Sequence, residues 1–206
     1  MKIITIFEDE DDKHLVGQIA RHSGIEIKNA PITLGGNDGQ KLRRTIREQS
    51  KTDHDRLVLV LDADHEPEGG SVKRWKDVLS ALRETGFAVP EGVSTENGLV
   101  CDLLDKRRVA VWLFPDCTSP GALEEFMMQA LIPTEDPLMQ DALAVVHTLK
   151  ERRFPSKYER KAEVRTWLAW QKRPGLPPGR AIAEKVLVPD ETRLAPFLAW
   201  LRQAFT

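Results

Sequence analysis

The stretch RLVLVLDAD, residues 56–64, joins five consecutive apolar side chains to a closely spaced pair of aspartates. An apolar run without polar alternation is typical of a strand that is buried on both faces, as in a parallel sheet covered by helices. A second such run, RVAVWLFPD at residues 108–116, also ends in an aspartate. Together they predict a parallel sheet with carboxylates gathered beyond the ends of its strands.

Strand-like and helix-like segments alternate around these two runs, which favours an α/β fold with a mostly parallel sheet flanked by helices. Further strands are expected at residues 2–7, 25–30 and 98–104. Helices are expected over residues 11–22, 39–49, 72–85 and 120–132, where apolar residues recur at helical spacing.

After Pro137 the alternation stops, and only helices are predicted, over residues 138–152, 157–170, 179–187 and 191–205. We therefore expect an α/β core over residues 1–134 and an all-helical C-terminal region over residues 135–206 that packs on it. Three tryptophans of this region have leucine neighbours and are predicted to lie in the core: Trp167, Trp170 and Trp200.

The composition is typical of a globular protein, with 41% hydrophobic and 30% charged residues among 206. No apolar run approaches the roughly 18 residues of a membrane span, and no basic and apolar leader precedes the first strand. A cytoplasmic protein without membrane association is therefore predicted. The two cysteines, Cys101 and Cys117, have neither zinc-site spacing nor the context of a disulfide framework.

Carboxylates follow three of the predicted strands. They are Glu8 in the run FEDEDD, then Asp62 and Asp64, and Asp116, with Glu124 and Glu125 in the helix that follows. Carboxylates that converge need a counter-charge, and oxygen ligands without Cys or His suit Mg²⁺ or Mn²⁺ rather than Zn²⁺. The spacing leaves open whether one or two ions bind, and which of Glu124 and Glu125 faces the sheet. The acidic run taken alone is more typical of a solvated loop that caps a helix, and it is the coincidence of acids at three strand ends that favours a metal site.

At these residues the chain resembles the Toprim fold of topoisomerases, primases and OLD-type nucleases. More closely, it resembles a bacterial family of small Toprim-like proteins of unknown function. Phe7-Glu8-Asp9 followed by Asp12 matches the first Toprim motif, and Asp62-x-Asp64 matches the second. The segment PDCTSPGALEE, residues 115–125, and the tail KAEVRTWLAWQKRPGLPPGRAI, residues 161–182, match the small family.

The resemblance implies metal-dependent phosphodiester chemistry on nucleic acid, in phage defence or DNA maintenance. Glu8, Asp62 and Asp64 would be catalytic. The implied ligands of Mg²⁺ or Mn²⁺ are Glu8, Asp12, Asp62, Asp64, Asp116 and Glu124. Activated water is the expected nucleophile, because the only tyrosine, Tyr158, has no winged-helix context. Two departures from the family pattern are Asp9, where glycine is usual, and Cys117, where asparagine is usual.

The net charge of −2 excludes indiscriminate binding to nucleic acid, but residues 150–173 hold nine Lys or Arg against three Glu. This segment is predicted to contact phosphates, on DNA in preference to RNA. Its candidate binding residues are Arg152, Arg153, Lys157, Arg160, Lys161 and Arg165. The alternative is that these charges form the solvated faces of packed helices.

Two other functions remain open. A Toprim-like module without catalysis would bind metal and a protein partner. A receiver-like domain would accept a phosphoryl group at Asp62, but the segment FPDCTSP lacks the lysine that receivers carry after the corresponding strand.

Overall fold

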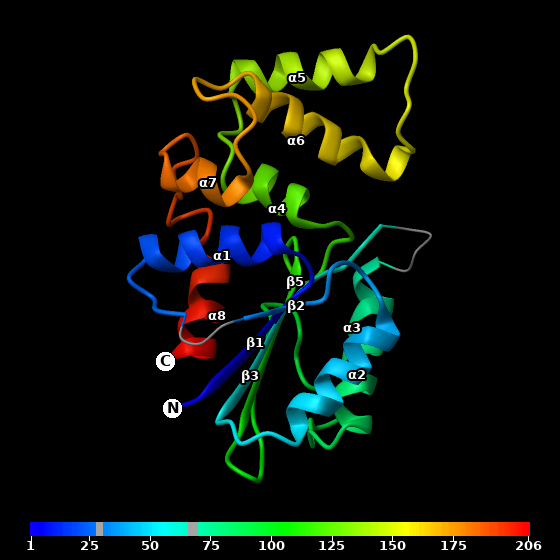
Figure 1. Ribbon diagram of the computed structural model, residues 1–206, viewed down its shortest axis with the longest axis vertical. Helices are drawn as coiled ribbons and strands as arrows, with labels where there is room; N and C mark the ends of the chain where they lie inside the picture. The colour runs from blue at the N-terminus through cyan, green and yellow to red at the C-terminus, as the bar shows by residue number, and fades with distance from the viewer. Residues whose placement is uncertain (28–30, 66–69) are drawn as a thin grey trace.

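The computed structural model describes residues 1–27, 31–65 and 70–206, and it is an α/β structure built around a mostly parallel sheet (Figure 1). Within these residues the sheet has five strands in the order β2-β1-β3-β5-β4. The strands are β1 (Ile3–Phe7), β2 (Ile32–Thr33), β3 (Arg56–Asp62), β4 (Leu99–Asp102) and β5 (Arg108–Phe114). The predicted fold class is thus confirmed at the level of a parallel sheet flanked by helices.

The three central strands, β1, β3 and β5, run parallel and end at the same edge of the sheet. Phe7 lies opposite Val60, and Asp62 lies opposite Phe114. The backbone N–H of Glu8 still donates to the carbonyl of Val60, at 3.1 Å. The register therefore brings the residues that follow β1 and β3 to one place. β4 is antiparallel to β5 and closes the far side of the sheet.

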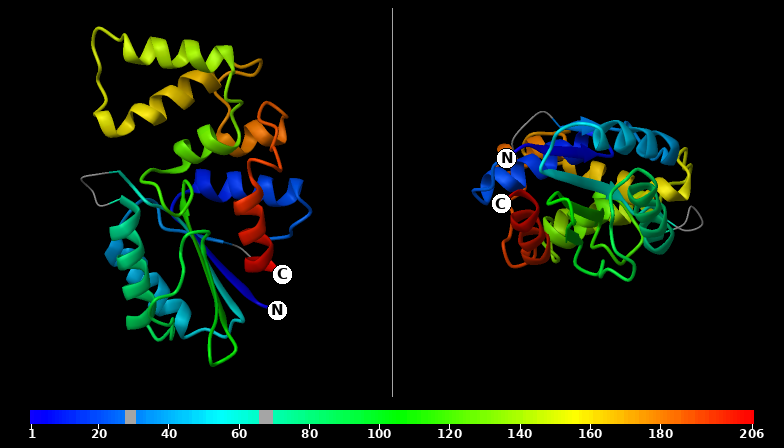
Figure 2. Two further views of the ribbon diagram at one scale, coloured as in Figure 1. Left: turned by 180° about the vertical axis from the view of Figure 1, so that it is seen from behind. Right: turned by 90° about the horizontal axis from the view of Figure 1, so that it is seen from below.

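Helices cover both faces of the sheet, with α2 and α3 on one face and α1 and α8 on the other (Figures 1 and 2). The helices are α1 (Glu10–His22), α2 (Gly39–Ser50), α3 (Gly70–Glu84), α4 (Leu123–Ala130), α5 (Pro137–His147), α6 (Glu159–Ala169), α7 (Pro178–Ala183) and α8 (Ala195–Phe205), with a 3-10 turn η1 (Ser156–Tyr158) before α6. None of the helices in the described ranges is both long and apolar enough to cross a bilayer.

An aromatic cluster joins the C-terminal helix to the sheet. Trp112 and Phe114 lie two residues apart on β5 and point to the same face. The ring of Trp112 lies 5.5 Å from that of Trp200 in α8, and the ring of Phe114 lies 4.7 Å from that of Phe126 in α4. The indole N–H of Trp200 donates to the carbonyl of Leu99 on β4, at 3.1 Å. Helix α8 therefore covers the sheet directly.

Two expectations from the sequence are wrong. The strand predicted at residues 25–30 is absent over residues 25–27, and residues 28–30 lie outside the described part. The strand β2 instead comes later and pairs only two residues with β1. Trp170, predicted to lie in the core, follows the last residue of α6 and has 42% of its surface exposed, whereas Trp167 and Trp200 are buried as expected. The helices and the remaining strands lie within a few residues of their predicted positions.

Candidate functional site

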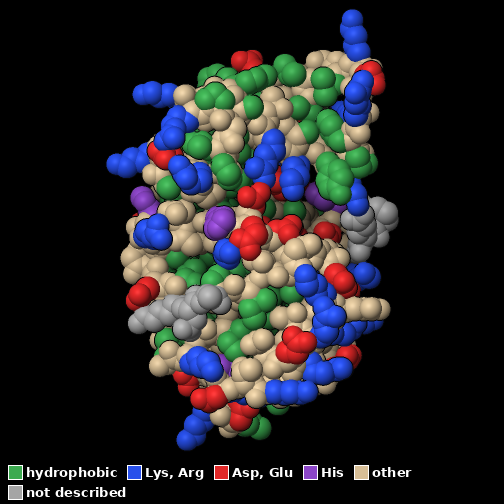
Figure 3. All heavy atoms as spheres, in the orientation of Figure 1, with side chains coloured by type: hydrophobic (Ala, Val, Ile, Leu, Met, Phe, Trp, Pro, Cys, Tyr) green, Lys and Arg blue, Asp and Glu red, His purple; other side chains and the backbone are tan. Residues whose placement is uncertain are grey.

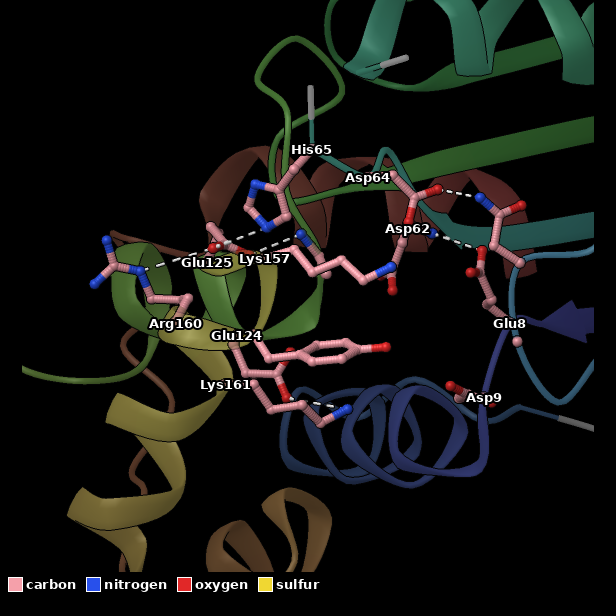
Figure 4. Close-up of a pocket in the computed structure, with 14 residues that line it drawn as sticks. Glu8, Asp9, Asp62, Asp64, His65, Glu124, Glu125, Lys157, Arg160 and Lys161 are labelled. Atoms are coloured by element: carbon pink, nitrogen blue, oxygen red, sulfur yellow. Dashed lines mark hydrogen bonds and ion pairs between the residues drawn. The ribbon is translucent and has the colours of Figure 1, made fainter. Parts of the chain in front are cut away.

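A cavity of about 500 Å³ lies beyond the ends of β1 and β3, between the sheet and the start of α6 (Figure 4). Carboxylates from the strand ends and from α4 form one wall, and cations from η1 and α6 form the opposite wall. The lining residues are Glu8, Asp9, Gly36, Asn37, Asp62, Asp64, His65, Ala122, Glu124, Glu125, Lys157, Tyr158, Arg160 and Lys161.

Glu8 follows β1 and is only 3% exposed. Its Oε2 atom accepts hydrogen bonds from the backbone N–H of Asp62, at 3.1 Å, and from Nη2 of Arg74, at 2.7 Å. Burial raises the pKa of this carboxyl group to about 7, although the positive charge of Arg74 opposes the shift. Glu8 is therefore a poorly solvated carboxylate held in a fixed orientation.

Arg74 is a residue of this site that the sequence analysis missed. It extends from α3, is buried, and donates through Nε to the carbonyl of Asp62, at 3.1 Å, and through Nη1 to Asn37, at 2.6 Å. Its sequence position carried a signal, because it precedes Val78 and Leu82 by four and eight residues. An arginine within the apolar stripe of a helix indicates a buried partner.

Asp62 is the last residue of β3 and Asp64 lies two positions later, and the two side chains have different surroundings. Oδ1 of Asp62 is buried and has no hydrogen-bond partner among the described residues. Burial, followed by the charges of Asp12 and Glu8, raises the pKa of Asp62 well above its usual range. Asp64 has a φ of 63° and exchanges backbone hydrogen bonds with Gly121, at 2.8 and 2.9 Å, while its carboxylate accepts from Asn37.

The run FEDEDD separates into residues with different roles. Asp12 is buried in the first turn of α1, and its carboxylate accepts from the backbone N–H of Asp9, at 2.9 Å. Burial raises the pKa of Asp12 well above its usual range. Asp11 forms an ion pair with Arg165 of α6, at 2.5 Å. A smaller cavity of about 280 Å³ adjoins this turn, and it is lined by Asp9, Glu10, Asp11, Asp12, Asp62, Leu123, Glu124 and Lys161.

Glu124 and Glu125 both reach the larger cavity, so both of the orientations left open by the sequence occur (Figure 4). Glu124 is buried, which raises the pKa of its carboxyl group, and Nζ of Lys161 lies 3.8 Å from it. Glu125 accepts from the backbone N–H of Ala122, at 2.8 Å. The same side chain lies 3.4 Å from His65 and 3.7 Å from Arg160.

Asp116, a predicted metal ligand, does not line either acidic cavity. Its carboxylate accepts hydrogen bonds from the backbone N–H and hydroxyl groups of Thr118 and Ser119, at 2.7–2.9 Å. Burial favours a higher pKa here, but these hydrogen bonds prevail and lower the pKa of Asp116. The short polar sequence that follows Asp116 is typical of such a turn.

The six predicted phosphate-binding residues fall into two groups. Lys157, Arg160 and Lys161 line the larger cavity, and Arg165 pairs with Asp11 beside it. Arg152 is paired with Glu159, at 3.0 and 3.1 Å, and Arg153 with Glu151, at 3.0 Å, away from the cavity. On this face of the molecule, acidic side chains gather across the middle and basic side chains lie directly above them (Figure 3).

The described side chains include one compact cluster of potential metal-ligand atoms, which lies outside the cavity. Over the described ranges, one trio of His, Cys, Asp or Glu ligand atoms lies within 4.8 Å of one another, namely His147, Glu159 and Glu163. This trio joins α5 to α6, and Arg152 and Arg160 already neutralise its two glutamates. The cavity carboxylates are more widely spaced, but they offer only oxygen donors, as Mg²⁺ and Mn²⁺ prefer. The buried Oδ1 of Asp62, which has no described hydrogen-bond partner, belongs to this set, and the chemistry of the set fits such an ion.

No curated protein and no solved structure matches the chain. The model of one protein family, described as "Protein of unknown function (DUF3226)", matches residues 3–206. Because this match spans nearly the whole sequence, including every residue of the cavity, the chain belongs to that family.

Proposed function

We propose that this protein hydrolyses phosphodiester bonds of nucleic acid with the aid of Mg²⁺ or Mn²⁺, as its resemblance to Toprim proteins implies. The observation that carries the proposal is the buried Oδ1 atom of Asp62. It has no hydrogen-bond partner in the described structure, and its side chain lines a cavity with acids on one wall and cations on the other. A buried polar atom without a partner is costly, and a bound cation would satisfy it.

The charges of the cavity support the same conclusion. Six carboxylates and three Lys or Arg side chains line it. An anionic phosphodiester would be repelled by the acidic wall unless a cation stood between them. A bound divalent ion would supply this charge and would activate water for attack.

The roles of individual residues follow from their positions. Glu8, Asp62 and Asp64 would hold the cation at the strand ends. Asp12 and Glu124 border the smaller cavity beside Asp62, and they would hold a second ion. Lys157, Arg160 and Lys161 face this wall and would bind phosphates on either side of the scissile bond.

One observation favours a second candidate, an inactive module. Arg74 already gives Glu8 a positive partner, at 2.7 Å. A site in which this arginine has replaced the ion would bind a partner without cleaving it. A receiver-like role at Asp62 has weaker support, because Pro115, Asp116 and Cys117 follow β5 where a receiver carries a lysine.

Cleavage assays separate these candidates. Supercoiled plasmid, single-stranded DNA and RNA would be incubated with the protein and Mg²⁺ or Mn²⁺. We expect cleavage by the wild type, a loss of at least about 100-fold in Asp62→Asn and Glu8→Gln, and full activity in Asp77→Asn, an exposed acid of α3. Cleavage that persists unchanged in Asp62→Asn would come from a contaminant. Acetyl phosphate labelling that Asp62→Asn abolishes would instead favour the receiver.

A further inference from the structure

We propose, resting on the function proposed above, that the cavity takes a single strand of nucleic acid and that Tyr158 stacks on one of its bases.

The size of the cavity limits what can reach the acids. Its volume of about 500 Å³ falls within the range of roughly 300–1,000 Å³ that is typical of small-molecule pockets. The basic wall of η1 and α6 lies opposite the strand ends and restricts the approach from that side (Figure 4). An unstacked nucleotide fits such a space, whereas a base-paired segment does not, because its phosphates are held at the outside of a wide rod.

Tyr158 lies beside the three cations that would bind phosphates, so a base next to those phosphates would reach its ring. It ends η1, immediately before α6, and lines the cavity with 47% of its surface exposed. Nζ of Lys157 lies 5.3 Å from the centre of its ring. Proteins that bind single strands combine a basic track for the backbone with aromatic rings on which bases stack. Lys157, Tyr158, Arg160 and Lys161 provide this combination within five consecutive positions.

The fold does not account for the position of this ring. In the part of the chain that the structure describes, no hydrogen bond involves the hydroxyl group of Tyr158. Helix α6 is anchored instead by Val164, Trp167 and Leu168, which are buried. Substitution of Tyr158 is therefore expected to leave the protein folded, which makes it a usable test.

The test measures binding in Ca²⁺, which supplies a divalent charge and separates binding from cleavage. Fluorescence anisotropy would compare a short labelled single strand with the same sequence as a blunt duplex. The wild type is expected to bind the single strand at least about tenfold more tightly. Tyr158→Leu should weaken that binding by about 5- to 100-fold, since stacking on one aromatic ring has this value in single-strand binding proteins. Tyr158→Phe keeps the ring and should keep most of the affinity.

A matched control and a spectroscopic signal complete the test. Trp170→Leu removes an exposed aromatic residue that follows the opposite end of α6 and does not line the cavity, and it should leave binding unchanged. A single strand carrying 2-aminopurine should lose fluorescence on binding to the wild type and to Tyr158→Phe, but not to Tyr158→Leu, because stacking quenches this base.

Three results would overturn the inference. They are equal affinity for duplex and single strand, an unchanged affinity in Tyr158→Leu, and an equal loss in Tyr158→Phe and Tyr158→Leu, which would assign the contact to the hydroxyl group. Absence of cleavage in Mn²⁺ together with ring-dependent binding in Ca²⁺ would refute the proposed hydrolysis and would leave the stacking contact established. The two failures are therefore distinguishable.

Discussion

Arg74 and Glu8 form an ion pair in which both side chains are buried. Such a pair adds little net stability relative to an apolar pair, but removing one member leaves an uncompensated charge in a poorly solvated place. The same arginine donates to the carbonyl of Asp62 and to Asn37. Arg74 therefore fixes the orientation of the site as well as the charge of Glu8.

Arg74→Leu should lower the free energy of unfolding by about 3–5 kcal/mol at pH 8, because the buried carboxylate of Glu8 then has no counter-charge. Urea denaturation measures the change. Lys76→Leu, an exposed cation of the same helix, should change it by less than about 0.5 kcal/mol. In the double variant with Glu8→Gln the loss should be much smaller than the sum of the two single losses. Additive losses would show that the pair is not the source of the effect.

The pH dependence of stability follows from the raised pKa values. Glu8, with a pKa of about 7 against an ordinary 4.5, binds its proton more tightly in the folded than in the unfolded protein. Its stabilising contribution is present below pH 4.5 and is lost as the pH rises through 7. The pKa values of Asp12 and Asp62 are also raised, so these two groups change the stability with pH in the same sense as Glu8. Without divalent ions, the protein should unfold at a lower temperature at pH 8 than near pH 5.

Asp62→Asn replaces a buried carboxylate, whose Oδ1 atom has no described hydrogen-bond partner, with a neutral group of similar shape. In the absence of divalent ions, this variant should melt at a higher temperature than the wild type at pH 8, and its melting temperature should depend less on pH. Mn²⁺ should raise the melting temperature of the wild type but not of the variant, since only the wild type binds it. A lower melting temperature for the variant at pH 8 would contradict this account of Asp62.

Several site residues were predictable from the sequence because the end of a strand fixes where its next side chain lies. Glu8, Asp62 and Asp64 reach one cavity for that reason. Asp116 also follows a strand, yet its own loop satisfies its oxygens, which depends on local hydrogen bonds rather than on strand order. Arg74 lies on α3 and Tyr158 on η1, so tertiary packing rather than the order of the strands brings them to the acids.

At the scale of elements, α1 carries Asp12 and is held in place by α7. The two helices approach closely at Gly179. A Cβ atom there would lie 2.7 Å from the carbonyl carbon of His14 and 2.8 Å from its oxygen, both in the backbone of α1. This contact leaves no room for a side chain.

Gly179→Ala should therefore destabilise the protein by about 1–3 kcal/mol, because the helices must move apart. Gly17→Ala is a matched control within α1, where an added Cβ atom would meet nothing within 4 Å. The control should be neutral or stabilising by up to about 1 kcal/mol, since alanine favours a helix over glycine. Urea denaturation of both variants measures the difference, and equal stabilities would exclude the close contact.

Most elements were predictable because they are long and have clear periodicity, as in the buried strands β3 and β5. The strand β2 was placed too early, since IEIKNA has strand-like residues but the pairing with β1 involves only Ile32 and Thr33. Two paired residues leave no pattern from which a strand can be predicted.

At the scale of the whole molecule, the C-terminal helix completes the cover of the sheet. Phe197, Trp200 and Leu201 of α8 are buried, and Trp200 lies over both Trp112 and the backbone of β4. The sequence predicted helices over residues 135–206 that pack on the core, but it could not reveal which strands α8 covers. That depends on the shape of the aromatic cluster.

Residues 1–134 alone should fail to unfold cooperatively in urea, because the aromatic face of β5 would be exposed to water. Within the full chain, Trp200→Ala should lower the free energy of unfolding by about 3–5 kcal/mol, as is typical of large aromatic residues in a core. Circular dichroism against urea concentration measures both. A cooperative transition of the fragment with undiminished stability would show instead that residues 1–134 form an independent domain.

The central claim is that a divalent ion contacts the phosphate that is cleaved at the acidic wall. Its most direct test is the rate of cleavage of a single-stranded oligonucleotide in which sulfur replaces a non-bridging oxygen of the scissile phosphate. Sulfur is a poor ligand for Mg²⁺ and a better one for softer ions. We predict that cleavage in Mg²⁺ is slowed at least about tenfold by one sulfur stereoisomer and is restored in Mn²⁺ or Cd²⁺. Equal rates for sulfur and oxygen in Mg²⁺, or no cleavage of either substrate in any of these ions, would contradict the claim.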